Sequence, residues 1–143
     1  MKIIAQNKRA YFDYKILETY EAGIVLTGEE IKSIRAGNCS INTAYVKIFS
    51  SKKNQPECYL LGAMIKNSQD DQRTRKLLLK KAEINKLLGK TTEKGLTIVP
   101  IKLFIKHNFA KLDIGLAQGL KKFDKRNILK KKEIEKNIRK MHP

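Results

Sequence analysis

Hydrophobic and polar side chains alternate with a period of two in several stretches of the chain, which is typical of strands with one buried face. The clearest alternation runs over residues 97–106, and residues 112–116 repeat it after His107-Asn108. Asparagine favours tight turns, so these two stretches predict a β-hairpin with its turn at His107-Asn108.

Two further pairs of strands are predicted upstream of this hairpin. Residues 44–49 alternate in the same way, and the run at residues 58–65 is expected to pair with them. Residues 11–20 and 23–27 form the other pair, joined by a tight corner at Glu21-Ala22. The pattern therefore predicts about six short strands.

Two short segments have helical spacing instead. The first covers residues 29–35 and ends at Gly37, and the second covers about residues 80–88 and ends at Gly89. The residues expected to face the core are Ile31, Ile34, Ile84, Leu87 and Leu88. Such elements predict a mainly β fold, and a small antiparallel barrel of the oligonucleotide-binding (OB) type with two or three short helices is a common solution. Periodicity alone does not distinguish this barrel from another one.

The strand pattern stops after Gly119, which divides the chain into a body, residues 1–120, and a basic C-terminal tail, residues 121–143. The tail contains 10 basic and 3 acidic residues, a net charge of +7. It has too few apolar residues to fold on its own, so we expect it to be disordered when free. Ile134, Ile138 and Met141 share one helical face, which predicts a helix once the lysines are neutralised.

The whole chain carries 31 basic against 14 acidic residues, a formal net charge of +17. A surplus of this size is typical of proteins that neutralise the phosphate backbone of a nucleic acid. Lysines outnumber arginines by 25 to 6, so codon bias in an AT-rich genome is an alternative source of part of the charge. The arginines are therefore the more informative cations. They are Arg9, Arg35, Arg73, Arg75, Arg126 and Arg139.

Other classes of function are disfavoured. Cys39 and Cys58 form no CxxC pair and lie far from His107 and His142, so we expect reduced structural thiols and no metal site. The sequence offers no nucleophile paired with a histidine and no phosphate-binding glycine loop, which predicts a protein that is not an enzyme and needs no cofactor. No apolar run reaches the roughly 18 residues of a membrane span, and no signal peptide is evident, which predicts a cytoplasmic protein without a membrane partner.

Five short motifs combine cations with polar or aromatic residues. They are Asn7-Lys8-Arg9-Ala10, Tyr20-Glu21-Ala22-Gly23, residues 28–35 (GEEIKSIR), residues 73–79 (RTRKLLL) and Asp124-Lys125-Arg126.

In this order the motifs resemble the SsrA-binding protein family, SmpB, the partner of transfer-messenger RNA (tmRNA) in the rescue of stalled bacterial ribosomes by trans-translation. The resemblance implies an OB-type barrel that binds the tRNA-like domain of tmRNA and takes the place of an anticodon arm. It implies three partners: tmRNA, the ribosome at its decoding centre and mRNA channel, and elongation factor Tu through the aminoacylated tmRNA. We expect the protein to act as a monomer.

The RNA-contacting positions of the family fall here on Asn7, Glu21, Leu78 and Lys111. We expect Asn7 to hydrogen-bond a base edge or a 2′-hydroxyl of the RNA. The alternative is that it only caps a turn. Glu21 accepts a base amino hydrogen, orients Lys8 or Arg9, or is only a turn residue. Residue type alone predicts that Leu78 belongs to the core. Only the resemblance favours an RNA contact for it.

Further RNA contacts are expected from neighbouring residues of the same motifs. For any single lysine among them, the alternative is a solvated surface residue. The set comprises Lys8, Arg9, Gly23, Arg75 and Lys76, with Arg73 at the flank.

The resemblance also assigns the tail to the ribosome, where the segment folds along an mRNA path that a truncated message leaves empty. The residues implied are Lys121, Lys122, Phe123, Asp124, Lys125, Arg126, Lys130, Lys131 and Lys132. The alternative is a generic basic extension. Two features depart from the family: Leu120 replaces an expected lysine, and the loop at residues 66–72 is short.

The rival function is a ribosomal or general single-stranded RNA-binding protein with an OB fold. Such a protein would bind many RNAs, whereas the resemblance predicts one dominant RNA with a tRNA-like end.

Overall fold

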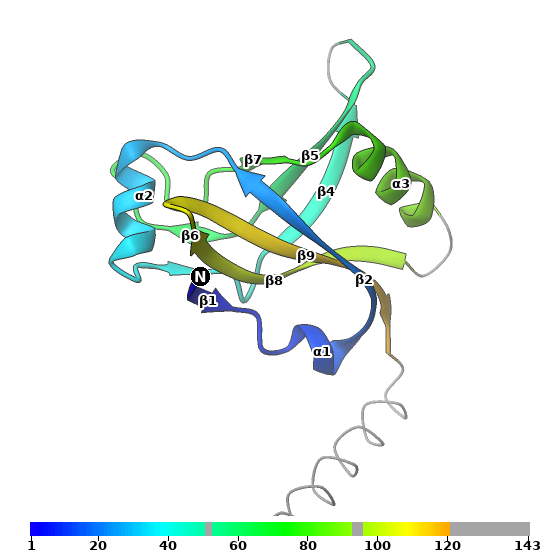
Figure 1. The fold of residues 1–143 in the computed structure, drawn as a ribbon, viewed down its shortest axis with the longest axis horizontal. Coiled ribbons are helices and arrows are strands. Elements are labelled where there is room, and N and C mark those ends of the chain that lie inside the picture. The colour runs from blue at the N-terminus through cyan, green and yellow to red at the C-terminus, as the bar shows by residue number, and fades with distance from the viewer. Residues whose placement is uncertain (51–52, 93–95, 121–143) are drawn as a thin grey trace, which may run out of the picture.

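The computed structural model describes residues 1–50, 53–92 and 96–120 (Figure 1). The elements in these ranges are β1 Lys2–Gln6, α1 Ala10–Asp13, β2 Tyr14–Ile24, α2 Gly28–Arg35, β3 Cys39–Ser40, β4 Tyr45–Ser50, β5 Pro56–Leu61, β6 Met64–Ile65, β7 Arg75–Leu78, α3 Lys81–Thr91, β8 Leu96–Lys106 and β9 Phe109–Gly119. The mainly β, antiparallel fold with short helices is therefore confirmed.

Seven strands form one antiparallel sheet in the order β1-β8-β9-β2-β7-β5-β4, and β3 pairs with β6. The sheet curves strongly, with α2 at one end and α3 at the other (Figure 1). Within the described residues β1 and β4 are its two edges, so strand pairing does not close the barrel. A pocket lies between β4 and the first half of β8, lined by Val46, Ile48, Leu96 and Ile98 among others.

The core lies on the concave side of this sheet. Its fully buried members come from β2, β5, β7, β8 and β9 and from the helices. They include Ala22, Ile34, Leu60, Leu77, Leu87, Leu103, Leu112 and Ile114. We call the opposite, convex side the outer face.

The C-terminal hairpin is confirmed in position. His107 and Asn108 both have positive φ angles, 51° and 67°, as the turn between β8 and β9 requires. The register shifts between Pro100 and Lys102, so Ile101 lies in a bulge. This position suits Pro100, because a proline has no N–H to donate to a ladder.

The predicted corner at Glu21-Ala22 is wrong. Residues 14–24 form one continuous strand, β2, and residues 10–13 form the helix α1. Glu21 pairs with Asp113 and Gly23 with Lys111 in the ladder between β2 and β9. The glycine that suggested a turn allows a close approach instead: a Cβ at Gly23 would lie 3.3 Å from the Cβ of Leu78.

The predicted strand at residues 58–65 is interrupted. Its first part, β5, pairs with β4 as expected, from Tyr45 with Leu61 to Ser50 with Pro56. The chain then turns at Gly62, which has a φ angle of +74°. The last residues form β6, which pairs with β3.

Helix α2 begins with a capping box in which Thr27 and Glu30 exchange hydrogen bonds between side chains and backbone amides. It ends before Gly37, whose φ angle is +80°. Of the two residues expected in the core, Ile34 is buried and Ile31 is 38% exposed.

Helix α3 is longer than predicted. It continues to Thr91, because nothing about Gly89 forces a stop: its φ angle is not positive, and the chain turns only after Thr91. Leu87 is buried as expected, whereas Leu88 lies on the solvent side.

Candidate RNA interface

Polar side chains form a row across four strands of the outer face. The strand registers align Gln6 of β1, Lys102 of β8, Asp113 of β9 and Glu21 of β2. Lys102 Nζ lies 3.5 Å from Asp113 Oδ2, and Lys106 Nζ lies 3.4 Å from Glu21 Oε1. Each carboxylate in the row therefore has a lysine beside it, which reduces its repulsion of a phosphate.

Burial raises the pKa of Asp113 above its ordinary value, and Lys102 opposes this by favouring the charged form. Glu21 contacts Lys106 and not Lys8 or Arg9, the cations suggested for it from the sequence. Glu21 is on the surface, in the middle of a strand, with its carboxylate available to a base amino group.

A second row contains the other residues that the resemblance picked out. Gly23 pairs with Lys111 on one side and with Leu78 on the other. The absence of a side chain at Gly23 lets Leu78 lie against β2. Leu78 is 54% exposed, so it belongs to the surface and not to the core. Lys111 and Leu78 thus flank Gly23, and the Leu78 side chain occupies the space that a side chain at Gly23 would fill.

Asn7 joins the N-terminal segment to the bulge of β8. Its backbone N–H donates to Ile101 O at 2.8 Å, and its side-chain Nδ2 donates to Pro100 O at 3.1 Å. Its carbonyl accepts from the Ala10 N–H at 3.1 Å. The Asn7 side chain therefore ties the N-terminal segment to β8, while its backbone carbonyl closes the turn that leads into α1. Its amide oxygen accepts no hydrogen bond among the described residues.

A cleft of about 550 Å³ opens beside Asn7, between the segment that leads into α1 and the outer face of the sheet. Its walls are mostly polar and include three residues of the first row, one each from β1, β8 and β9. The lining residues are Gln6, Asn7, Lys8, Tyr11, Thr19, Ile101, Lys102 and Asp113. Lys8 is exposed at its rim. Arg9 is also exposed, but its guanidinium group is held by Asp13 at 3.3 Å and lies over the Phe12 ring.

The predicted RNA contact of Arg75 is contradicted by its burial. Its side chain is 0% exposed, and its Nη2 lies 2.5 Å from Glu30 Oε2. Its guanidinium group also donates to the carbonyls of Ala63, Ile65 and Asp71. Arg75 therefore holds α2, β6 and β7 together from inside.

Glu30 is the centre of this buried network. Burial on its own raises the pKa of Glu30, but hydrogen bonds from Arg73, the Thr27 amide and Arg75, together with the Arg75 charge, lower it to about 2. Asn67 Nδ2 also donates to Glu30 Oε2, at 3.2 Å. The short loop at residues 66–72 is thereby tied to α2. Arg73, the flanking candidate, is partly exposed but engaged with Glu30.

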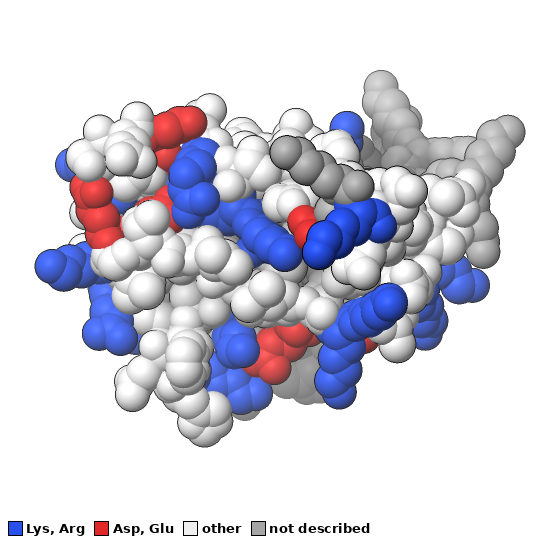
Figure 2. Space-filling view, turned by 90° about the horizontal axis from the view of Figure 1, so that it is seen from above, with Lys and Arg blue, Asp and Glu red and all other residues white. Residues whose placement is uncertain are grey.

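Lys76, unlike Arg75, lies on the surface, where an RNA phosphate could reach it. Lys76 is exposed on the outer face and lies 3.5 Å from Glu57. Figure 2 shows lysine and arginine side chains across the middle of the side seen from above, with acidic side chains between them.

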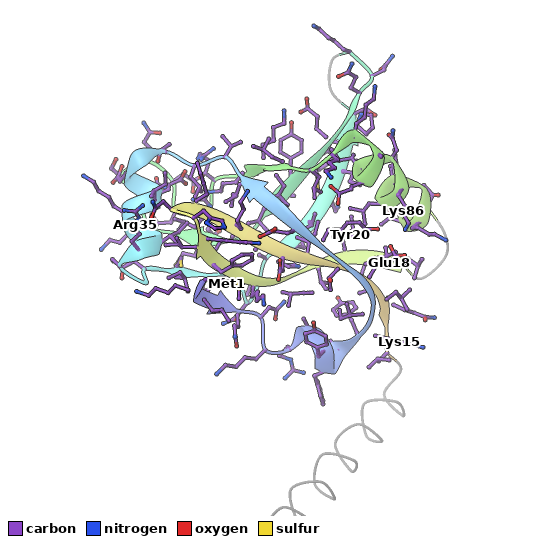
Figure 3. All side chains as sticks on the ribbon, viewed as in Figure 1. Met1, Lys15, Glu18, Tyr20, Arg35 and Lys86 are labelled. Carbon is purple, nitrogen blue, oxygen red and sulfur yellow. The ribbon has the colours of Figure 1, made fainter. Side chains whose placement is uncertain are left out.

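The sequence analysis did not single out Lys102, Lys106 and Asp113 for this surface. Alternation along residues 97–106 already placed both lysines on the polar face of their strand, but only the registers bring them beside Glu21. A second missed cluster joins β2 to α3, where Tyr20 donates to Glu18 Oε2 at 2.5 Å and Lys86 to Glu18 Oε1 at 3.2 Å (Figure 3). This cluster links α3 to the sheet at the surface, where both side chains of the ion pair are exposed.

The tail residues assigned to the ribosome, from 121 to 132, lie outside the described residues. Across residues 1–50, 53–92 and 96–120, no group of three or more His, Cys, Asp or Glu side chains could hold a metal ion. In the same ranges no helix is long and apolar enough to cross a membrane.

Comparison with known proteins gives consistent matches over almost the whole chain. The family model described as SmpB protein matches residues 4–142. The SsrA-binding protein of a Nitratiruptor species is 50% identical over 143 residues, covering 97% of this chain and 95% of that protein. The SsrA-binding protein of a Sulfurihydrogenibium species is 47% identical over 141 residues, covering 97% and 93%.

A chain from the solved structure "tmRNA-SmpB: a journey to the center of the bacterial ribosome" has the same fold, with a TM-score of 0.62 and 44% sequence identity. The match covers 82% of this chain and 84% of that one. The family model and these relatives agree on one assignment, and this chain belongs to the SmpB protein family.

Proposed function

We propose that this protein binds the tRNA-like domain of tmRNA through the outer face of its sheet and delivers it to stalled ribosomes in trans-translation. The observation that carries the proposal is the row in which Lys111, Gly23 and Leu78 lie side by side on β9, β2 and β7. The membership of the chain in the SmpB family supports it, because its relatives are named for binding SsrA RNA.

The two rows supply different kinds of contact. Lys111 and Lys76 provide positive charge for phosphates, which contributes affinity but little sequence information. Leu78, which lies exposed over Gly23, supplies an apolar contact for a base or ribose. Glu21 accepts from a base amino hydrogen while Lys106 keeps the local charge balanced, and a carboxylate in that role favours cytosine or another base with an exocyclic amine.

The cleft beside Asn7 adds a second contact region. The Asn7 amide oxygen is the acceptor that its three structural hydrogen bonds leave over, and a 2′-hydroxyl of RNA is a suitable donor for it. Lys8 and Lys102 border the same cleft and supply phosphate contacts. These residues act by binding and not by catalysis.

The tail, residues 121–143, is assigned to the ribosome in this proposal. Its +7 charge suits an RNA-lined channel, and Lys125 and Arg126 would pair with phosphates of small-subunit RNA. An intact message would exclude the tail by occupying the channel, whereas a truncated message would leave room for it. The protein would then act in the cytoplasm as a monomer, with elongation factor Tu bound to the aminoacylated tmRNA.

Sequencing the RNA that co-purifies with the full chain at moderate salt tests the proposal directly. We expect one dominant RNA with a tRNA-like end, and a gel shift with the isolated tRNA-like domain of a bacterial tmRNA. A broad mixture of RNAs of equal abundance would favour the general RNA-binding alternative and contradict the proposal.

Deleting residues 124–143 tests the division of roles between body and tail. The truncated protein should bind the tRNA-like domain almost as well as the full chain does, but fail to support tagging in a reconstituted translation reaction with a truncated message. If the deletion removed most of the RNA affinity, the tail would be an electrostatic anchor and not a ribosome-specific segment.

A further inference from the structure

An exposed aromatic pair lies on the outer face beyond the two rows described above. The Phe49 and Tyr59 rings are 5.8 Å apart between centroids, with an angle of 48° between their planes. Phe49 is 46% exposed although it belongs to a regular strand, β4, at the edge of the sheet. A large aromatic ring left this open on a strand has a surface available to a partner.

Hydrogen bonding fixes the orientation of the Tyr59 ring. The Tyr59 hydroxyl donates to Glu57 Oε2, and Lys76 lies 3.5 Å from the other oxygen of Glu57. The hydrogen bond from Tyr59 and the Lys76 charge lower the pKa of Glu57, so its carboxylate stays ionised and paired. The Tyr59 ring is therefore held against β5, and the Phe49 ring leans on it.

Basic side chains lie on both sides of Tyr59, and the register partner of Phe49 is Glu57, which Lys76 neutralises. Tyr59 pairs in register with Lys47 of β4 and with Lys76 of β7, and both lysines are exposed. Lys76 shares β7 with Leu78, so the pair continues the surface proposed for tmRNA and is not an isolated patch. Exposed aromatic rings between lysines are the usual arrangement for stacking an unpaired base while its phosphates are neutralised.

We propose that Phe49, supported by Tyr59, is a stacking site for one unpaired RNA base, with Lys47 and Lys76 on the flanking phosphates. The proposal rests on the RNA-binding function proposed above and extends its surface by two strands, to the β4 edge. A double-stranded segment does not fit this chemistry, because its bases are already stacked on one another. The partner is thus a single-stranded segment of the bound RNA.

The sequence offers a direct spectroscopic test, because the chain contains no tryptophan. The variant Phe49→Trp introduces one indole ring at the proposed site, in the full chain. Stacking of a base on this ring quenches its fluorescence. We expect quenching by a short oligoadenylate, and much weaker quenching by an RNA duplex of the same total charge.

Affinity measurements on three proteins complete the test. Phe49→Leu keeps an apolar side chain of similar reach but removes the ring, and should weaken oligoadenylate binding by about fivefold or more. Phe49→Trp should retain the affinity of the natural protein. Thermal unfolding followed by circular dichroism serves as the folding control, and the exposed edge position of Phe49 predicts little change.

Two outcomes would overturn the inference. Quenching that is absent, or equal for oligoadenylate and duplex, would exclude base stacking at Phe49. Unchanged oligoadenylate affinity in Phe49→Leu would also exclude it. Failure of the function proposed above looks different, because the natural protein itself would then not bind the tRNA-like domain of tmRNA.

Discussion

The buried carboxylate of Glu30 makes the stability of this protein depend on pH in a way that one substitution can isolate. Glu30→Gln keeps the shape of the side chain and removes its charge. The amide of the variant can accept through one oxygen only, whereas the carboxylate accepts from Arg73, Arg75 and the Thr27 amide. The substitution therefore leaves the buried Arg75 guanidinium without its counter-charge.

The size of the effect follows from the pKa. Glu30 has a pKa of about 2 in the folded protein and an ordinary value of 4.5, a difference of about 2.5 units, which corresponds to about 3 kcal/mol at neutral pH. Breaking a buried ion pair by removing one partner costs about 3–5 kcal/mol in other proteins. We therefore expect Glu30→Gln to lower the free energy of unfolding by about 3–5 kcal/mol at pH 7.

The sign of the pH dependence is fixed by the direction of the shift. A carboxyl group whose pKa is depressed on folding contributes stability above its unfolded pKa, and this stability is lost as pH falls through the folded pKa. For Glu30 the loss takes place between about pH 5 and pH 2. The difference between the natural protein and Glu30→Gln should accordingly shrink by about 2 kcal/mol between pH 7 and pH 3.

Urea unfolding followed by far-ultraviolet circular dichroism at these two pH values measures the difference. Glu29→Gln is the matched control, because Glu29 is the adjacent residue of α2 but is exposed. Its loss should cost under about 1 kcal/mol. A Glu30→Gln deficit that is equal at pH 7 and pH 3, or no larger than that of Glu29→Gln, would refute the assignment of a charged, structural role to Glu30.

Three further outcomes are expected. Gly62→Ala should lower the free energy of unfolding by about 1–2 kcal/mol, because the φ angle is +74° and the new Cβ would lie 3.1 Å from a backbone oxygen. Gly28→Ala is its control in the same urea titration and should change little, because nothing lies within 4 Å of the new Cβ. Burial raises the pKa of Cys58 to about 12, so Ellman's reagent should modify the half-buried Cys39 first and Cys58 only under unfolding conditions; equal rates in the folded protein would contradict its burial. Lys111→Ala should weaken tmRNA binding and reduce the slope of log affinity against log salt by about one, and an unchanged slope would mean that Lys111 does not contact phosphate.

Local patterns in the sequence predicted what depends on neighbours along the chain. The turn at His107-Asn108 and the hairpin around it were recoverable, because alternation on both sides and a turn-forming asparagine agree. The helix predicted at residues 29–35 was also recoverable; it begins one residue earlier, at Gly28, after the capping box between Thr27 and Glu30. The corner at Glu21-Ala22 was not, because a glycine that admits a neighbouring strand looks the same in sequence as one that makes a turn.

The candidate site could be predicted only in part, because its residues depend on partners far away in the sequence. Arginine is a residue type typical of RNA contacts. Arg75 is nevertheless buried, because it pairs with Glu30, which lies 45 residues earlier in the chain. Leucine is a residue type typical of the core. Leu78 is nevertheless exposed, because the strand register places it beside Gly23. Neither partner could be identified from local spacing. The family resemblance supplied Leu78 and Lys111, and the sheet registers explain why these two are neighbours.

Strand β9 also determines how the body responds to mechanical load. It lies between β8 and β2 and pairs with both over almost its full length, and the residue after it, Leu120, donates to Asp13 O at 2.9 Å. Hydrogen bonds in antiparallel ladders run perpendicular to the strands. Tension applied at Leu120 along β9 therefore shears two ladders at once and does not peel one bond at a time. A ribosome that pulls on the C-terminal segment would thus move the RNA-binding body as a unit before it could unravel the sheet.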